Sequence, residues 1–294
     1  MKKKKGKIKI NMKQDFILFI IIAIIVVTVI RFKQKQNITS ENLAEQTMIE
    51  NEEVSTESQE NKKDLVLEQK LQSGKILGEE GLPVLMYHFF YDKSKDSGKD
   101  GNWIEISDFE EQMKYLVEND FYFPTWEQVE NYIDGKQELP EKSVVITVDD
   151  GDPSFFELAV PIIQKYKIPT TSFVITYWYG NRASDKQEYV SYQSHSYDMH
   201  KAGSNGKGVM LSWDYDKIKD DILLSRDVLG GADIFCYPFG QYNDLDIKVL
   251  KENGYKLAFT TKGGRVKKGS SKYELPRVRI SGNTGMAEFK KKIE

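Results

Sequence analysis

The chain has 294 residues but only one cysteine and three histidines. The single Cys236 excludes an intramolecular disulfide, so the fold cannot depend on one. A concentration of basic residues is also missing from most of the chain. Residues 1–35 carry nine lysines, one arginine and one aspartate, a net charge of +9. Because the whole chain carries −3, the remaining residues carry −12. This acidic remainder argues against a nucleic-acid partner, which would require a basic surface on the folded part.

The longest apolar run lies near the amino terminus. Residues 16–30 are apolar except for Thr28, with seven lysines before them and Arg31 and Lys33 after them. A helix of this length spans about 22 Å, and flanking residues with long basic side chains extend it toward the roughly 30 Å hydrocarbon core. No small-x-small cleavage pattern follows, so the sequence favours an uncleaved anchor over a cleaved signal peptide. The positive charges place the amino terminus in the cytoplasm and the remainder outside.

Composition divides the chain into four segments. We predict a cytoplasmic basic segment at residues 1–15, a transmembrane signal anchor at 16–32, a disordered extracellular stalk at 33–80, and a folded domain at 81–294. The stalk prediction depends on the absence of aromatic residues between Phe32 and Tyr87. A polar segment of this kind cannot bury enough apolar surface to offset the entropy lost on folding. Scattered aliphatic residues at 65–77 allow one short helix.

Strand and helix patterns alternate from residue 81 onward. Short runs of apolar residues predict strands at residues 84–87, 143–148, 171–176, 234–237, 257–260 and 278–280. Helices are predicted to begin at a capping box of Ser107 and Glu110, and to follow at residues 126–133, 155–166, 216–229 and 245–253. Repeated β-α units favour a parallel sheet covered by helices, either a barrel or a doubly wound sheet.

Carboxylates and histidines lie near the ends of these strands. His88 follows the first strand, and Asp149 and Asp150 follow the next, while His195 and His200 are five residues apart. In barrels the active site lies at the carboxyl ends of the strands. Two neutral imidazoles and one carboxylate are a common ligand set for catalytic zinc, with the fourth position left to water. Together these residues predict a hydrolase site.

Each motif alone has a simpler interpretation. Asp149 and Asp150 before Gly151 are typical of a polar turn, and lone histidines are often surface or core residues. A spacing of five residues puts His195 and His200 about 140° apart on an ideal helix. Both can bind one ion only if His195 lies in a loop or first turn before the segment that carries His200. Their joint occurrence favours the enzyme interpretation.

Three motifs together resemble the polysaccharide deacetylases with a NodB-homology domain, which form carbohydrate esterase family 4. They occur in the family's order, at residues 147–151, 195–200 and 237–240, and the likeness covers about residues 81–294. The resemblance implies a distorted (β/α) barrel of about seven strands. It also implies a divalent metal, with zinc the first choice.

The resemblance assigns roles to individual residues. Asp149 would be the general base, and the metal ligands would be Asp150, His195 and His200. The Phe239 backbone N–H would help to hold the oxyanion, within a substrate-contacting motif that also includes Tyr237 and Gly240.

Two departures point to the poly-N-acetylglucosamine deacetylase branch of the family. The commonest members place the catalytic acid histidine near the carboxyl terminus, but this chain has no histidine after His200. The branch instead carries that histidine early, in a sequence similar to the one that ends in His88, and it shows the same wide histidine spacing. A third departure is Cys236, because many relatives have at this place an arginine that orients the base. Arg277 is a candidate replacement, and a buried carboxylic acid is an alternative to His88 as the acid.

The sequence therefore predicts a membrane-anchored, extracellular enzyme that removes N-acetyl groups from N-acetylglucosamine units of a surface polysaccharide. Its partners would be that polysaccharide and, through residues 16–32, the membrane. Three alternatives stay open at this point. They are a deacetylase acting on peptidoglycan, an esterase acting on O-acetyl groups of a polysaccharide, and an inactive glycan-binding module of the same fold.

Overall fold

The computed structural model describes residues 64–72, 74–96, 101–204 and 206–294. The chain divides into two compact units, Met1–Val66 and Leu67–Glu294, and the second holds the candidate site. The predicted segments 1–15 and 16–32, and the stalk up to residue 63, lie outside the described residues. Within the described ranges, no helix has the length and apolar character needed to cross a membrane.

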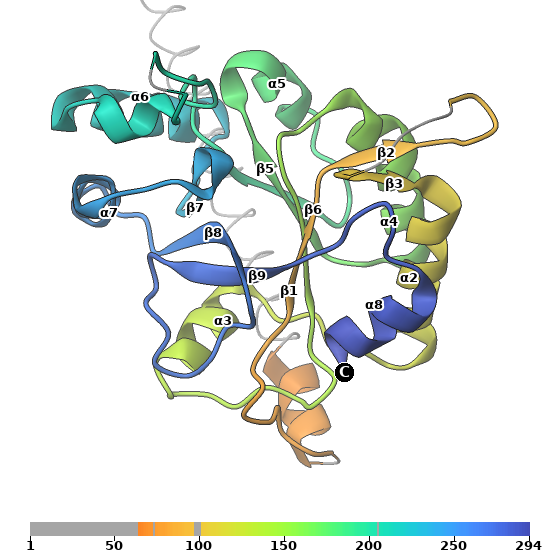
Figure 1. The fold of residues 1–294 in the computed structure, drawn as a ribbon. Helices are drawn as coiled ribbons and strands as arrows, with labels where there is room; N and C mark the ends of the chain where they lie inside the picture. The colour runs from red at the N-terminus through yellow and green to blue at the C-terminus, as the bar shows by residue number, and fades with distance from the viewer. Residues whose placement is uncertain (1–63, 73, 97–100, 205) are drawn as a thin grey trace, which may run out of the picture. The chain divides into compact units, whose positions relative to one another are not determined.

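Seven parallel strands close into a barrel (Figure 1). In ring order they are β1 (Val84–Tyr87), β4 (Val145–Val148), β5 (Thr170–Val174), β6 (Val190–Ser194), β7 (Ile234–Cys236), β8 (Leu257–Gly263) and β9 (Leu275–Arg279). β1 closes the ring by pairing with β4 on one side and β9 on the other. The pairing is irregular in two places, since β6 and β7 share only the pair Ser194↔Phe235 and the register of β8 against β9 shifts between Phe259 and Gly263. The predicted α/β barrel of about seven strands is confirmed, and the doubly wound alternative is wrong.

Helices connect the strands and lie outside the barrel. They are α2 (Ile106–Glu118), α3 (Trp126–Ile133), α4 (Val160–Tyr166), α5 (Thr176–Ala183), α6 (Tyr215–Val228), α7 (Asp244–Glu252) and α8 (Met286–Ile293), with short turns η1 (Phe155–Ala159), η2 (Val209–Ser212) and η3 (Pro238–Gly240). Helices α2, α4 and α8 lie together on one side, and α6 and α7 on another (Figure 1). Each group covers its own cluster of buried apolar side chains.

Several elements differ from those predicted. Helix α2 begins at Ile106 because Glu105, rather than Ser107, is its N-cap and accepts the Ser107 N–H. Strand β6 was not predicted, since its residues Val190–Ser194 are mostly polar and only partly buried. Two short strands, β2 (Phe89–Tyr91) and β3 (Trp103–Glu105), form a separate parallel pair beyond β1.

The folded unit begins earlier than residue 81. Residues 67–72 are helical, and Leu67 is buried in a cluster with Leu77 and Leu82. The Leu77 N–H donates to the Leu139 carbonyl at 2.7 Å. Leu67 and Leu77, which lie in the predicted stalk, thus pack against apolar side chains of the barrel unit.

Candidate active site

The two carboxylates separate at a turn that follows β4. Asp150 has a φ of +75° and Gly151 a φ of +78°, so the chain leaves the extended conformation here. A side chain at Gly151 would meet Val174 at 3.0 Å, which makes glycine the residue that fits. The turn is held by the Ile175 N–H, which donates to the Asp150 carbonyl at 3.1 Å. Asp149 and Asp150 consequently contact different partners.

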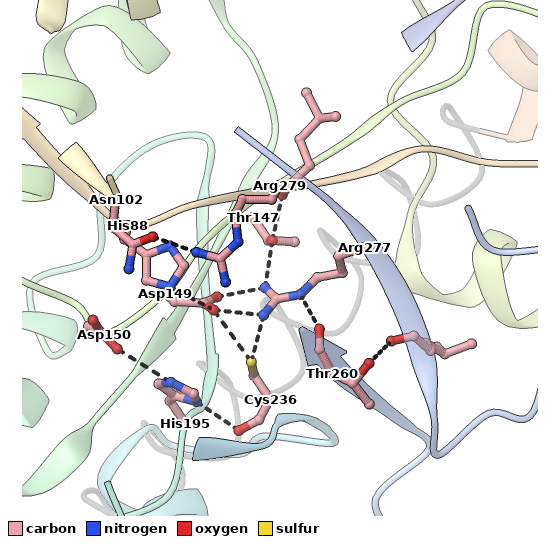
Figure 2. A network of polar contacts seen from close by, with 12 residues as sticks. His88, Asn102, Thr147, Asp149, Asp150, His195, Cys236, Thr260, Arg277 and Arg279 are labelled. Carbon is pink, nitrogen blue, oxygen red and sulfur yellow. Dashed lines mark hydrogen bonds and ion pairs between the residues drawn. The ribbon is translucent and has the colours of Figure 1, made fainter. Parts of the chain in front are cut away.

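Asp150 faces two histidines, of which Figure 2 shows His195. Its Oδ1 lies 3.4 Å from Nε2 of His195 and 3.6 Å from Nε2 of His200. These three ligand atoms lie within 4.8 Å of one another. Asp150 Oδ1 is buried and has no hydrogen-bond partner among the described residues. A buried acceptor without a donor is costly, and a cation at this point would satisfy it. The residues therefore fit a divalent metal.

The histidine side chains present the nitrogens that a metal requires. Nδ1 of His195 lies 2.7 Å from the Cys236 carbonyl oxygen, which fixes a proton on Nδ1 and turns Nε2 toward Asp150. Burial and the neighbouring His195 lower the pKa of His200 to about 4, so this ring is neutral at pH 7. Burial opposes charge on His195 too, but Cys236 and Asp150 outweigh it and raise the pKa of that ring. Metal binding would displace a proton there.

A buried aspartate on α6 holds the loop that carries both histidines. The Tyr197 N–H donates to Asp221 Oδ1 at 2.7 Å, and the Asp198 N–H donates to Oδ2 at 2.8 Å. His195 directly follows β6 and His200 lies in the loop, as the spacing of five residues requires. Sequence reasoning did not identify Asp221. The available signal was its position on the buried face of the helix, between Ile218 and Ser225.

Asp149 is paired with an arginine rather than with the histidines. Arg277, on β9, donates from Nη1 to Asp149 Oδ1 and from Nη2 to Oδ2, both at 2.7 Å (Figure 2). The guanidinium is fully buried and also donates to Thr147 Oγ1 and the Thr260 carbonyl. Burial alone would raise the pKa of Asp149, but Arg277 outweighs it and holds that pKa well below its ordinary value. Asp149 is thus a fixed carboxylate.

Cys236 contacts both Asp149 and Arg277. Its Sγ accepts from Arg277 Nη2 at 3.1 Å and donates to Asp149 Oδ2 at 3.6 Å. Burial raises the pKa of the thiol, so it stays neutral. Arg277 from β9 thus contacts both Asp149 and Cys236, and its role as the residue that orients the base stays a prediction.

A second group of potential ligands, Asp149, His195 and Cys236, also lies within 4.8 Å. Arg277 Nη2 stands 2.7 Å from the carboxylate and 3.1 Å from the sulfur of this group, and its charge would repel a cation there. The nitrogen of His195 that lies next to Cys236 is Nδ1, and it is already hydrogen-bonded to the Cys236 carbonyl oxygen. The group of Asp150, His195 and His200 is accordingly the better metal site.

His88 lies on the Asp149 side of the site. Its Nε2 is 3.7 Å from Asp149 Oδ2, and its side chain is 11% exposed. Burial lowers its pKa, although Asp149 and Asp150 act in the opposite direction. Nδ1 has no hydrogen-bond partner among the described residues. Arg279 reaches the same region, where it donates to Asn102 Oδ1 at 2.5 Å (Figure 2).

Some residues of the motif at 237–240 lie beside the site, and others lie in the core. Phe239 has a φ of +59°, and its ring lies 4.3 Å from that of His200. The turn is closed by the Gly240 and Gln241 N–H groups, which donate to the Tyr237 and Pro238 carbonyls and leave the Phe239 N–H outside these bonds. Gly240 cannot carry a side chain, since a Cβ would lie 2.1 Å from Thr261 Oγ1.

Tyr237 does not reach the site with its side chain. The ring is fully buried, stacks on Tyr242 at 4.8 Å, and donates its hydroxyl to the Tyr273 carbonyl. Of the three predicted substrate-contacting residues, Phe239 alone has both a side chain beside the site and a backbone N–H that takes no part in the turn.

Comparisons with known proteins agree with this geometry. The sequence profile described as Polysaccharide deacetylase matches residues 136–258. A poly-beta-1,6-N-acetyl-D-glucosamine N-deacetylase of Staphylococcus aureus (strain MRSA252) is 29% identical over 212 residues, which cover 66% of this chain and 72% of that protein. IcaB from Ammonifex degensii matches in structure with a TM-score of 0.61 and 26% identity, over 71% of this chain and 96% of IcaB. The Streptococcus pyogenes deacetylase PplD shares the fold, with a TM-score of 0.63 and 22% identity, over 75% of this chain and 99% of PplD.

The profile match contains the carboxylate pair, both histidines that face Asp150 and the turn at Phe239. His88 and Arg277 lie outside the matched stretch, although the barrel brings both to Asp149. Motifs, fold and relatives lead to the same assignment. Within this chain, residues 136–258 form a polysaccharide deacetylase domain.

Proposed function

We propose that this protein is a metal-dependent hydrolase that removes N-acetyl groups from a polysaccharide of the poly-β-1,6-N-acetylglucosamine type. The observation that carries the proposal is that the two adjacent carboxylates have different partners. Asp150 lies with His195 and His200 in a group that fits a metal ion, whereas Asp149 accepts two hydrogen bonds from Arg277. The names of the staphylococcal relatives support the choice of polymer.

Asp150, His195 and His200 would hold a divalent metal, for which zinc suits two imidazoles and one carboxylate. Such a metal supplies a Lewis acid that polarises the acetyl carbonyl and acidifies the attacking water. Asp149 would accept a proton from that water. Because Arg277 lowers its pKa, Asp149 is a weak base that depends on this acidification, and the paired guanidinium keeps its two oxygens in place.

His88 would protonate the leaving amine. An amine is a poor leaving group without a proton, and His88 is the histidine that remains once two are assigned to the metal. Its lowered pKa makes the imidazolium a stronger acid than an ordinary histidine. The Phe239 N–H would donate to the acetyl oxygen when this atom becomes negatively charged.

The lysine-flanked run at residues 16–30 supports a membrane anchor, with the enzyme unit outside the cell. Protease added to intact cells should then release that unit by cutting within residues 33–63. Complete protection of the unit would contradict this placement.

The function is tested with the purified full-length protein, stripped of metal and reloaded with zinc. Release of acetate is followed on β-1,6-linked N-acetylglucosamine oligomers, on peptidoglycan fragments and on an O-acetylated polysaccharide. We expect zinc-dependent release from the oligomers, with Asp149→Asn as the inactive control. Preferred hydrolysis of peptidoglycan, or of esters without amides, would assign a different substrate. Glycan binding without any release would indicate an inactive module.

A further inference from the structure

We propose that Trp178, supported by Tyr177, forms a stacking subsite for the sugar unit next to the one whose acetyl group is removed. This inference rests on the proposed function and extends it from the reacting unit to the polymer. It predicts that the enzyme gains from substrates longer than a single sugar.

Exposed aromatic side chains lie around the loop that carries His195 and His200. Tyr177 is 58% exposed, Trp178 50% and Phe239 43%, and they are three of the nine exposed large apolar side chains within the described ranges. Large aromatic rings are seldom left in water without a role, and a group of them at one site marks a binding surface. Aromatic side chains combine an apolar face with a polar group, which matches the apolar C–H face and the hydroxyl rim of a sugar.

Trp178 is placed directly beside the candidate metal site. Its ring centroid lies 6.4 Å from that of His200, and the two planes meet at 66°. Phe239 contacts the same histidine at 4.3 Å. A polymer whose acetyl group reaches His200 must therefore pass near the indole ring.

The backbone under Trp178 is fixed to the same loop. The Thr176 N–H donates to the Ser196 carbonyl at 3.1 Å, and the Tyr177 N–H donates to the Tyr197 carbonyl at 3.0 Å. One turn later, Gly180 packs closely on α6, because a Cβ there would meet Val228 at 2.6 Å. Helix α5 thus presents the ring from a rigid position, which limits the entropy lost when a ligand binds.

The loop at residues 195–201, which α5 contacts, carries polar groups as well as the aromatic ring of Tyr197. The Tyr177 ring stands edge-on to Tyr197 at 5.5 Å. The same loop carries the exposed ion pair of Lys201 with Asp198, at 2.5 Å. Hydroxyl and charged groups beside aromatic faces can bind the hydroxyls of a hexosamine unit.

The test compares Trp178→Ala with the conservative Trp178→Phe in the full-length, zinc-loaded protein. Leu224→Ala is the matched control, because Leu224 is a 43% exposed apolar residue on α6. Substrates are β-1,6-linked N-acetylglucosamine oligomers of increasing length and a small acetyl ester such as 4-nitrophenyl acetate. Zinc content is measured for every variant.

We expect Trp178→Ala to raise KM on the longer oligomers about 3- to 10-fold, the worth of one aromatic stacking contact. Activity on the small ester and zinc content should not change, Trp178→Phe should keep most of the affinity, and Leu224→Ala should match the wild type. An equal loss on the ester, or a loss of zinc, would show that Trp178 only shields His200. An active wild type whose oligomer KM does not respond to Trp178→Ala overturns the subsite alone. A wild type inactive on all oligomers overturns the proposed function together with the subsite.

Discussion

Asp149 and Asp150 are adjacent in the sequence, yet the structure surrounds them with opposite kinds of partner. Asp149 accepts two hydrogen bonds from the buried Arg277, so both of its oxygens are satisfied. Asp150 faces the Nε2 atoms of His195 and His200, and its Oδ1 has no donor among the described residues. The first environment already contains its cation, whereas the second has the ligands for one.

This contrast explains how one short turn supplies two functions. A carboxylate held by arginine keeps its charge and position but is not available as a metal ligand. A carboxylate that faces the Nε2 atoms of two imidazoles is placed to bind a metal ion together with them. The difference comes from Arg277 and the histidine loop, and not from the identity of the two residues themselves.

Apart from changes to the two carboxylates, the largest effect on turnover should come from a change at His88, which lies beside Asp149. We expect His88→Ala to lower the turnover of amide substrates by about 10²–10⁴-fold, the usual range for losing one acid-base group. An acetyl ester with a good leaving group needs less protonation and should lose less activity. Zinc content and the unfolding transition serve as controls, since neither should change. Near-normal amide turnover in the variant would show that a different group supplies the proton.

Breaking the arginine pair should chiefly reduce stability. Arg277→Met removes the guanidinium that pairs with the buried Asp149 carboxylate and should cost about 3–5 kcal/mol of unfolding free energy at pH 7. Arg279→Met, an exposed position on the same strand, should cost far less.

The pH dependence of that cost follows from the lowered pKa of Asp149. A depressed carboxyl pKa stabilises the fold above the unfolded value of 3.8, and the contribution is lost as the pH falls below it. The stability difference between the wild type and Arg277→Met should therefore be largest near pH 7 and should shrink below about pH 4. A difference that does not change with pH would mean that the pair adds no electrostatic stability.

A smaller effect is expected at Asp221, which holds the loop that carries the two histidines. Asp221→Asn keeps the shape of the side chain but can accept from only one of the two N–H groups, at Tyr197 and Asp198. We expect zinc affinity to fall about 10–100-fold, while turnover at saturating zinc stays close to the wild type.

Asp246→Asn is the matched control for this variant. Asp246 is also buried, has a pKa raised to about 6 by burial as Asp221 does, and accepts a backbone N–H, but it caps α7 instead of the histidine loop. It should alter stability without changing zinc affinity. Equal zinc affinity in both variants would show that Asp221 does not position the ligands.

Much of this arrangement could be predicted from the sequence, for identifiable reasons. Strands β1 and β4 are buried along their whole length, so their apolar runs indicated both the barrel and the strand ends that carry His88 and Asp149. Strand β6 could not be predicted in this way, because its side chains are mostly polar, and His195 consequently had no predicted strand before it.

Contacts between residues far apart in the sequence were harder to predict. Nothing local in the sequence connects Arg277 with Asp149, since their contact depends on β9 closing the ring against β1. The roles given to Tyr237 and Gly240 came from their proximity in one motif, but the tyrosine ring turns into the core and the Gly240 N–H closes the turn. Asp221 resembled an ordinary helix residue until the loop it holds was visible.

The zinc content of Asp149→Asn and Asp150→Asn, purified side by side, tests the central claim most directly. Both substitutions remove one charge with almost no change in shape, so a difference between them reports the surroundings of each carboxylate. We expect Asp149→Asn to keep zinc at the wild-type ratio and lose turnover, and Asp150→Asn to lose zinc. Loss of zinc from Asp149→Asn together with its retention in Asp150→Asn would contradict the assignment of base and ligand.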